Sequence, residues 1–182
     1  AATWPNQLAI TDEYGALTYS QLYEKTELLK NFLLYSGTVP ETGIALMTNN
    51  SRYFIIGLYA GIGSGCVIMP LANYQRPEEV RKALQQARIH FILSDNPEMA
   101  SLGNQVTAIN LFEQPLYLSK TGFDVKNKTV PFLTDVAVMR FTSGTPGNAR
   151  CVLLCHQPVL DRVQAANEGL QLSSFDRVLG VL

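Results

Sequence analysis

Three short apolar runs alternate with helix-forming segments, and this alternation restricts the fold more than any other feature of the sequence. The runs are GIALMT (43–48), CVIMPL (66–71) and HFILSD (90–95). Continuous apolar runs of this length are typical of strands buried on both faces of a sheet. Helices are predicted between them, the first from about 52 to 62 and the second opening at Pro77, with Glu78 and Glu79 in its first turn. The pattern predicts βαβ units and an α/β fold: a mostly parallel sheet with flanking helices.

Extra strands are expected on both sides of this region. Residues 8–11 and 16–18 predict a hairpin turned through Tyr14 and Gly15. Thr18 and Gln21 have the spacing of a capping box, which predicts a helix that runs to Ser36-Gly37. Short β-prone pieces predict edge strands within 96–130.

The C-terminal part resumes the strand and helix pattern. Residues 135–141 and 151–155 predict two strands, and 158–168 predict a helix. The last apolar run, 177–182, predicts a further strand.

The uncharged stretch from 54 to 72 raises the question of a membrane span. It is 19 residues long and contains two GxxxG spacings, Gly57 to Gly61 and Gly61 to Gly65. Four glycines and Pro70 would interrupt a spanning helix. A buried helix, a glycine turn and a core strand are therefore favoured.

Charge and cysteine usage restrict the class of partner. The chain has 14 basic and 15 acidic residues, a formal net charge of −1, and they are mixed along the sequence, which argues against nucleic acid and anionic membranes. The three cysteines form no CxxC pair, and only two histidines are present, so no metal-ligand cluster is predicted. A reduced, cytoplasmic setting follows from the odd cysteine count. Cys151 and Cys155, which alternate with apolar residues, are expected as small core residues.

The stretch RFTSGTPGNARCVLLCH (140–156) places hydroxyls and glycines between two β-prone segments. Such a loop can direct backbone N–H groups and Ser or Thr hydroxyls toward phosphate oxygens, and Arg150 could add a bidentate cation. A plain β-turn uses the same residue types, so composition leaves both interpretations open. It is not a Walker A loop, because a strand rather than a helix follows.

Other polar residues give weaker indications. The glycines at 61, 63 and 65 follow a helix, which favours a helix-to-strand turn over a dinucleotide site. His156 could orient a substrate group or be structural, and His90 is expected in the core or at an edge. The remaining acid candidates have no paired partner in the sequence and are expected to be solvated: Asp161, Glu168 and Asp176.

Three stretches together resemble the adenylate-forming enzymes, the superfamily of acyl-CoA synthetases, peptide-synthetase adenylation domains and luciferases. FTSGTPGNARCVLLCH (141–156) is similar to the family's phosphate-loop signature [YF]-T-S-G-[ST]-T-G-x-P-K-G-V with a following histidine. ALTYSQL (16–22) resembles L-T-Y-x-E-L, and GSGCVIMPLANYQRPEEV (63–80) resembles G-A-x-x-x-P-L-N-P-x-x-P-x-E-E. The three matches keep the family's order and span nearly the whole chain.

The resemblance implies the fold of the N-terminal subdomain of an acyl-CoA synthetase and a two-step reaction. A carboxylic acid and ATP, with Mg²⁺, give an acyl-adenylate and pyrophosphate, and the acyl group then passes to CoA or a carrier-protein phosphopantetheine. Arg150 would take the place of the family's loop lysine, and His156 would lie on the substrate side. The resemblance assigns the grip on the β- and γ-phosphates to Thr142, Ser143, Gly144, Thr145 and Gly147.

The loop also departs from the family pattern. Pro146 replaces a threonine and removes a hydroxyl and a backbone N–H. Arg150 keeps the charge of the lysine but is planar and longer, and Cys151 replaces a glycine. Loss of one donor to an anion costs about 1.5–3 kcal/mol, a tenfold or larger loss of affinity. A degenerate, non-catalytic nucleotide- or partner-binding homologue is therefore an alternative to the ligase.

Family members continue for several hundred residues beyond the point that corresponds to Leu182. The resemblance places the adenine-binding strand, the ribose-binding aspartate and the mobile C-terminal domain with its catalytic lysine in that part. Residues 1–182 are expected to form a single N-terminal, partial AMP-binding domain with no catalytic residue of its own. Two sources are considered, an acyl-CoA synthetase and a peptide-synthetase adenylation domain, and the rest of the same chain is expected as the partner.

Overall fold

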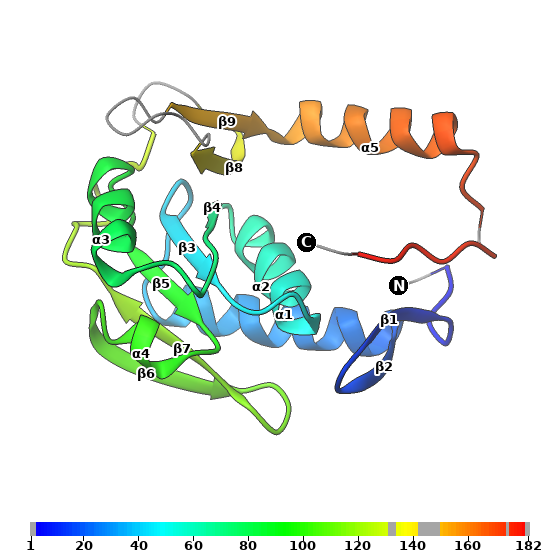
Figure 1. Cartoon of the computed structure of the whole chain (residues 1–182), viewed down its shortest axis with the longest axis horizontal. Helices are drawn as coiled ribbons and strands as arrows, with labels where there is room; N and C mark the ends of the chain where they lie inside the picture. The colour runs from blue at the N-terminus through cyan, green and yellow to red at the C-terminus, as the bar shows by residue number, and fades with distance from the viewer. Residues whose placement is uncertain (1–2, 131–133, 142–149, 174, 181–182) are drawn as a thin grey trace.

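The computed structural model describes residues 3–130, 134–141, 150–173 and 175–180. Within these residues a central sheet lies between helices on both faces, and a small N-terminal hairpin stands beside it (Figure 1). The elements, in chain order, are β1 (Leu8–Asp12), β2 (Gly15–Thr18), α1 (Tyr19–Tyr35), β3 (Gly43–Met47), α2 (Arg52–Gly63), β4 (Val67–Pro70), α3 (Pro77–Gln86), β5 (Phe91–Ser94), α4 (Pro97–Ala100), β6 (Asn104–Asn110), β7 (Pro115–Lys120), β8 (Val136–Phe141), β9 (Cys151–Cys155) and α5 (His156–Leu170).

The seven-stranded sheet has the order β6-β7-β5-β3-β4-β8-β9. Its four central strands are parallel, with Ile44 opposite Ile68 and Phe91, and Ile68 opposite Val138. The strands β6, β7 and β9 pair in antiparallel fashion at the two ends of the sheet. The predicted α/β class with a parallel centre, flanking helices and extra strands is confirmed.

One strand prediction is wrong in detail. β7 was expected at an edge, but it pairs with β5 on one side and with β6 on the other, so only β6 is the edge strand there. The physical reason is the burial of Leu116, Leu118 and Ser119. An edge position would expose the backbone of a strand whose side chains are largely buried.

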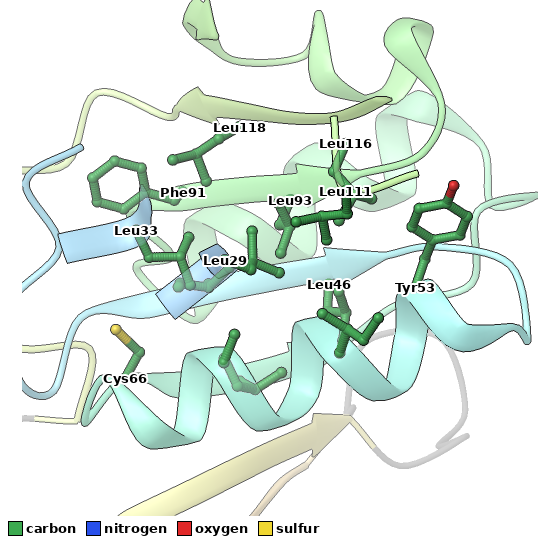
Figure 2. Close-up of a cluster of buried hydrophobic side chains, with 14 of the residues drawn as sticks. Leu29, Leu33, Leu46, Tyr53, Cys66, Phe91, Leu93, Leu111, Leu116 and Leu118 are labelled. Carbon is green, nitrogen blue, oxygen red and sulfur yellow. The ribbon is translucent and has the colours of Figure 1, made fainter. Parts of the chain in front are cut away.

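The core has two parts, one on each face of the sheet. On the α1 and α2 face, Leu29, Leu33 and Tyr53 pack against Leu46 and Phe91 (Figure 2). On the α3 face, the helix residues Val80 and Leu84 pack with the sheet residues Ala45, Met47, Met69 and Ile92. Because β3 is buried along its whole length, it contributes side chains to both parts.

The N-terminal hairpin and the first helix follow the prediction. β1 and β2 are antiparallel, and Gly15 adopts a positive φ of 103° at the turn. Thr18 Oγ1 accepts from the N–H of Gln21, and Gln21 Oε1 accepts from the N–H of Thr18, at 3.2 and 2.9 Å. This is the predicted capping box, and α1 ends at Tyr35 as expected.

The glycine-rich stretch forms α2, a turn and β4, as predicted. Gly57 and Gly61 pack against the sheet: an added Cβ would lie 2.7 Å from Leu46 Cδ1 and 2.2 Å from Ile68 Cδ1, respectively. Gly65 adopts a φ of 75° in the turn. No helix among the described residues is long and apolar enough to cross a membrane. At Gly57 and Gly61 the missing side chains allow α2 to pack closely against the sheet.

The C-terminal elements differ from the prediction at three points. Helix α5 begins at His156, two residues earlier than expected. Residues 177–180 form no strand, and Val178 and Leu179 are exposed, because no described strand pairs with them. Cys151 was expected in the core but is exposed, since it lies on the outermost strand, β9. Residues 181–182 lie outside the described residues.

Candidate functional site

A groove opens at the carboxyl ends of the parallel strands. The chain leaves β3 toward α2 and leaves the neighbouring β4 toward α3, and these two helices cover opposite faces of the sheet. The loops after β3 and β4 therefore diverge at this point. In open α/β sheets, ligands bind in such a crevice. The sequence and the topology together make this the first place to look for a binding site.

The groove has a volume of about 650 Å³, within the range of small-molecule sites. Phe54 and Leu58 of α2 and Val138 and Leu154 of β8 and β9 supply apolar walls. Pro70, Leu71 and Ala72 add further apolar surface. Six polar residues also line the groove: Thr48, Asn49, Asn50, Asn73, Tyr74 and Arg140. No Asp or Glu is among the described residues of the lining. The composition suits a ligand with an apolar body and an anionic group.

Asn49 ties the two diverging loops together. Its side-chain carbonyl accepts from Asn73 Nδ2 at 2.6 Å, and its backbone N–H donates to the Asp95 carboxylate at 2.8 Å. Burial raises the pKa of Asp95, although the Asn49 hydrogen bond works in the opposite direction. Asn49 is thus fixed by its backbone to the residue that follows β5 and by its side chain to the loop after β4.

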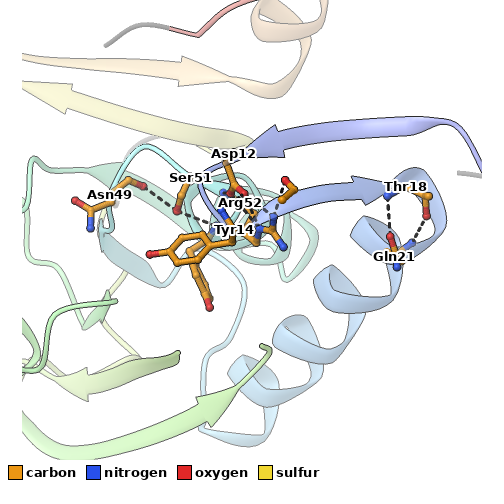
Figure 3. A network of polar contacts seen from close by, with 9 residues as sticks. Asp12, Tyr14, Thr18, Gln21, Asn49, Ser51 and Arg52 are labelled. Carbon is orange, nitrogen blue, oxygen red and sulfur yellow. Dashed lines mark hydrogen bonds and ion pairs between the residues drawn. The ribbon is translucent and has the colours of Figure 1, made fainter. Parts of the chain in front are cut away.

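The hairpin holds the other end of the same loop. The Asp12 carboxylate accepts from the backbone N–H of Arg52 at 2.8 Å and pairs with its guanidinium, which also donates to Gly15 O at 2.9 Å (Figure 3). Ser51 Oγ accepts from the N–H of Tyr53 and caps α2. Burial opposes ionisation of Asp12, but the Arg52 hydrogen bonds and charge outweigh it, and the pKa of Asp12 is lowered.

Among the described residues that line the groove, Arg140 is the one cation, and it is exposed. Val138 and Arg140 are two residues apart on β8 and therefore project from the same face of the sheet. Met139 and Phe141 pack with the core on the opposite face. Within the described ranges, the Arg140 guanidinium makes no hydrogen bond and no ion pair.

The predicted phosphate-binding residues Thr142, Ser143, Gly144, Thr145 and Gly147 lie outside the described residues. Their flanks are described: Phe141 ends β8 opposite Cys151, which begins β9. Because β8 is parallel to β4, Phe141 lies at the same edge of the sheet as the groove. Arg150 is exposed directly before β9.

His156 is half-buried at the start of α5, and its backbone N–H donates to Asp135 O at 3.0 Å. It lies at the strand-to-helix junction, as predicted, and its role in substrate binding stays a prediction. His90 is buried as expected: its Nδ1 accepts from Gly43 N–H at 3.0 Å and its Nε2 lies 2.7 Å from Asn127 O. These contacts give His90 a structural role in the core.

The acid candidates are exposed, and none faces another acid. Asp161 and Glu168 accept from glutamines one turn away on α5, and Asp176 accepts from Ser173. Among the described residues, no group of three or more His, Cys, Asp and Glu could hold a metal ion.

Sequence reasoning missed the groove residues Asn49, Asn73 and Arg140. A signal for two of them is present: Asn49 and Asn73 follow the buried strands β3 and β4, and strand ends of a parallel sheet meet at one edge. Arg140 could be found as a cation inside an otherwise apolar strand, 135–141. The pairing of Asp12 with Arg52 has no signal in the sequence, because it joins residues forty positions apart.

Solved structures share this fold. VinN superimposes with a TM-score of 0.73 at 18% identity, over 94% of this chain and 45% of that chain. The O-succinylbenzoate CoA synthetase MenE from Bacillus subtilis, in complex with AMP, superimposes with a TM-score of 0.75 at 16% identity, over 97% of this chain and 46% of that one. The expected fold, that of the N-terminal subdomain of an acyl-CoA synthetase, is confirmed.

Curated relatives are similar over the whole chain. Tyrocidine synthase 3 of Brevibacillus parabrevis is 28% identical over 179 residues, which cover 98% of this chain and 3% of that protein. Bacitracin synthase 2 of Bacillus licheniformis is also 28% identical, over 98% of this chain and 7% of that protein. The chain thus spans only a small part of these relatives. The family model described as AMP-binding enzyme matches residues 1–182, and the chain belongs to that family.

Proposed function

We propose that this chain is the N-terminal part of an ATP-dependent acyl-adenylating ligase. The proposed reaction joins a carboxylic acid to ATP, releases pyrophosphate, and then passes the acyl group to a thiol. The observation that carries the proposal is the family match along all 182 residues. In the sequence, the signature motif falls between the residues of β8 and β9. The groove at the same sheet edge supports it.

The phosphate loop is assigned to ATP. Thr142, Ser143 and Thr145 would donate hydroxyls, and Gly144 and Gly147 would let backbone N–H groups approach the β- and γ-phosphates. Arg150 would add a cation in place of the family's lysine. Fixed donors of this kind stabilise the charge that develops on leaving pyrophosphate. His156, at the N-terminal end of α5, would orient a group on the substrate side.

Mg²⁺ would accompany the nucleotide. Mg²⁺ keeps several waters and binds through phosphates with one or two carboxylates, so it does not need a dedicated cage of protein ligands. Nothing among the described residues offers such a cage. When bound, the ion would neutralise phosphate charge during transfer. The thiol acceptor in the proposal is CoA or a carrier-protein phosphopantetheine.

Similar proteins support both of the sources considered, an acyl-CoA synthetase and a peptide-synthetase adenylation domain. MenE has been solved with an acyl-adenylate intermediate, OSB-AMP, and VinN with L-aspartate. The sequence relatives include a tyrocidine synthase, a gramicidin S synthase and a nonribosomal peptide synthetase. We propose residues 1–182 as one N-terminal domain whose remaining chain would pack on α5, which has no buried residue among those described. This reaction fits a cytoplasmic setting, where ATP and CoA are present. It also fits a role in acyl or fatty acid metabolism.

Carboxylate-dependent ATP–pyrophosphate exchange tests the proposal. The complete gene product, screened with a broad panel of carboxylic and amino acids, should return labelled pyrophosphate to ATP with at least one acid. Folded protein that binds Mg²⁺-ATP but shows no exchange with any acid would sink the ligase assignment.

A second candidate rests on Pro146, which removes a donor from the loop. In this candidate the protein is a non-catalytic nucleotide- or partner-binding homologue. Pro146→Thr and Arg150→Lys, made together, should then strengthen ATP binding about tenfold or more in calorimetry. An unchanged dissociation constant would show that these two positions do not limit ATP binding.

A further inference from the structure

We infer that the groove is a docking site for the stretch of the same chain that directly follows Leu182, and that this stretch occupies the apolar part of the groove. The inference rests on the part of the proposed function that treats residues 1–182 as the first domain of a longer chain. Three observations carry it: the course of the C-terminal residues, the apolar walls of the groove, and a hydroxyl group in its lining that lacks a partner.

The C-terminal residues lead back to the groove. After α5 the chain reverses direction and returns toward α2 (Figure 1). The side-chain amide of Asn50, one of the lining residues, donates to the carbonyl oxygen of Gly180 at 3.4 Å. Two further residues span at most about 7 Å, so the chain leaves Leu182 close to the groove.

The surface around this point is apolar and open to further chain. Val178 and Leu179, which lead toward the groove, are exposed, and α5 has no buried residue among those described. This chain covers less than half of the length of VinN and of MenE. Exposed apolar surface of this kind is stabilised when more chain packs on it and removes it from water.

The walls of the groove suit an apolar segment. Phe54 and Leu58 of α2, Val138 of β8 and Leu154 of β9 line it, and each of these side chains is only half-buried. A docked segment would remove the rest of their surface from water. The one charged residue of the described lining, Arg140, is exposed and can keep its guanidinium in water.

Thr48 gives the groove a polar group without a partner. It follows β3 and is 7% exposed, and its Oγ1 makes no hydrogen bond to any described residue. A buried hydroxyl without a partner costs free energy, and a backbone N–H or C=O group of a docked segment would satisfy it. Asn50 already binds a backbone carbonyl group here. The polar part of the groove therefore suits main chain.

Photo-crosslinking in the complete gene product tests the inference. p-Benzoylphenylalanine replaces Tyr74, a groove residue that is 87% exposed in the structure, and mass spectrometry locates the crosslinked positions. Tyr35, which is 94% exposed at the end of α1, carries the same group in the matched control. We expect the probe at Tyr74 to crosslink within one molecule to residues shortly beyond Leu182, and the probe at Tyr35 not to do so.

Three results would overturn the inference. A crosslink between two molecules would assign the groove to a second copy of the chain, and a crosslink only to a distant part of the chain would assign it to another segment. A yield no higher than that of the control would show that the groove stays open in the complete protein. ATP–pyrophosphate exchange, measured on the same preparations, decides the ligase assignment separately, because crosslinking does not require activity.

A second pair of variants tests the hydroxyl group. Thr48→Val removes a hydroxyl that should be hydrogen-bonded in the complete protein, so it should lower the melting temperature by a few degrees. Thr26→Val is the control, because Thr26 Oγ1 on α1 also lacks a partner among the described residues but lies outside the groove. This change should leave the melting temperature the same or raise it. Equal shifts for the two variants would contradict the inference.

Discussion

Asp12 of the N-terminal hairpin and Arg52 at the first turn of α2 form a buried ion pair across forty residues of sequence. Arg52 Nε lies 3.0 Å from both carboxylate oxygens, and Arg52 is 4% exposed. The guanidinium also lies over the rings of Tyr14 and Phe112, at 5.6 and 5.1 Å. A cation at a helix N-terminus is unfavourable, and Asp12 offsets that cost. The pair connects the two-stranded sheet to the loop that lines the groove.

Breaking this pair should destabilise the fold. Asp12→Ala leaves the Arg52 guanidinium buried without its carboxylate, and such changes cost about 3–5 kcal/mol. Urea unfolding followed by circular dichroism measures the free energy of unfolding. Glu27→Ala is the control, because the Glu27 to Lys30 pair on α1 is much more exposed than the Asp12 pair and should contribute at most about 1 kcal/mol. Equal losses in the free energy of unfolding for the two substitutions would show that the Asp12 pair stabilises the fold no more than an exposed pair does.

The same pair predicts a pH dependence. The pKa of Asp12 is lowered in the folded chain, so its contribution is fully present above the unfolded value of about 3.9 and is lost as pH falls through the lower folded value. The stability difference between wild type and Asp12→Asn should therefore shrink as the pH drops below about 4. Unfolding free energies at a series of pH values check this. A difference that stays constant down to the acid transition would contradict it.

Two glycines of α2 should respond differently to alanine. Gly61→Ala would place a Cβ 2.2 Å from Ile68 Cδ1, and Ile68 is buried, so overpacking of about 1–3 kcal/mol should exceed the gain in helix propensity. Gly63→Ala meets only Lys30 Cδ at 3.5 Å and should be neutral or stabilising. Thermal melting of the two variants compares them directly. A stabilising Gly61→Ala would show that α2 does not pack this closely on β4.

Cys66 and Cys151 should differ in their reactivity toward alkylating reagents. Burial raises the pKa of Cys66 to about 11 and makes its thiol inaccessible to solvent. At pH 8 about one in a thousand such thiols is ionised, so Cys66 should resist iodoacetamide in the folded chain and react only in denaturant. Cys151 is exposed and should be alkylated. If Cys151 flanks an ATP site as proposed, Mg²⁺-ATP should slow its modification, and mass spectrometry of tryptic peptides reports both sites.

The central fold was predictable because local and global signals agree there. The run 43–48 is apolar throughout and becomes a strand buried along its whole length, and Thr18 and Gln21 carry a cap that depends on neighbours three residues apart. The interior place of β7 and the exposure of Cys151 were not predictable. Both depend on which strands pair, and pairing is decided by tertiary contacts that residue patterns do not encode.

The candidate site was predictable only where a signature exists. The motif between residues 141 and 156 identifies the family. The groove residues lie far apart in the sequence: Asn49 follows β3, Asn73 follows β4, and Arg140 is part of β8. Their convergence requires the strand order, and the strand order β5-β3-β4-β8 does not follow the chain. Asp12 supports the site through its contacts with Arg52, and these contacts depend on the position of the hairpin beside α2.

The assignment as an acyl-adenylating ligase is best tested by ATP–pyrophosphate exchange in the complete gene product, with and without carboxylic acid. We expect exchange that depends on the acid and on Mg²⁺, and that falls when the loop hydroxyls are removed by Thr142→Val and Ser143→Ala. Circular dichroism of both variants should match the parent, since the predicted effect is on phosphate binding and not on folding. Exchange that survives both substitutions unchanged, or a folded parent without exchange for any acid, would rule out the assignment.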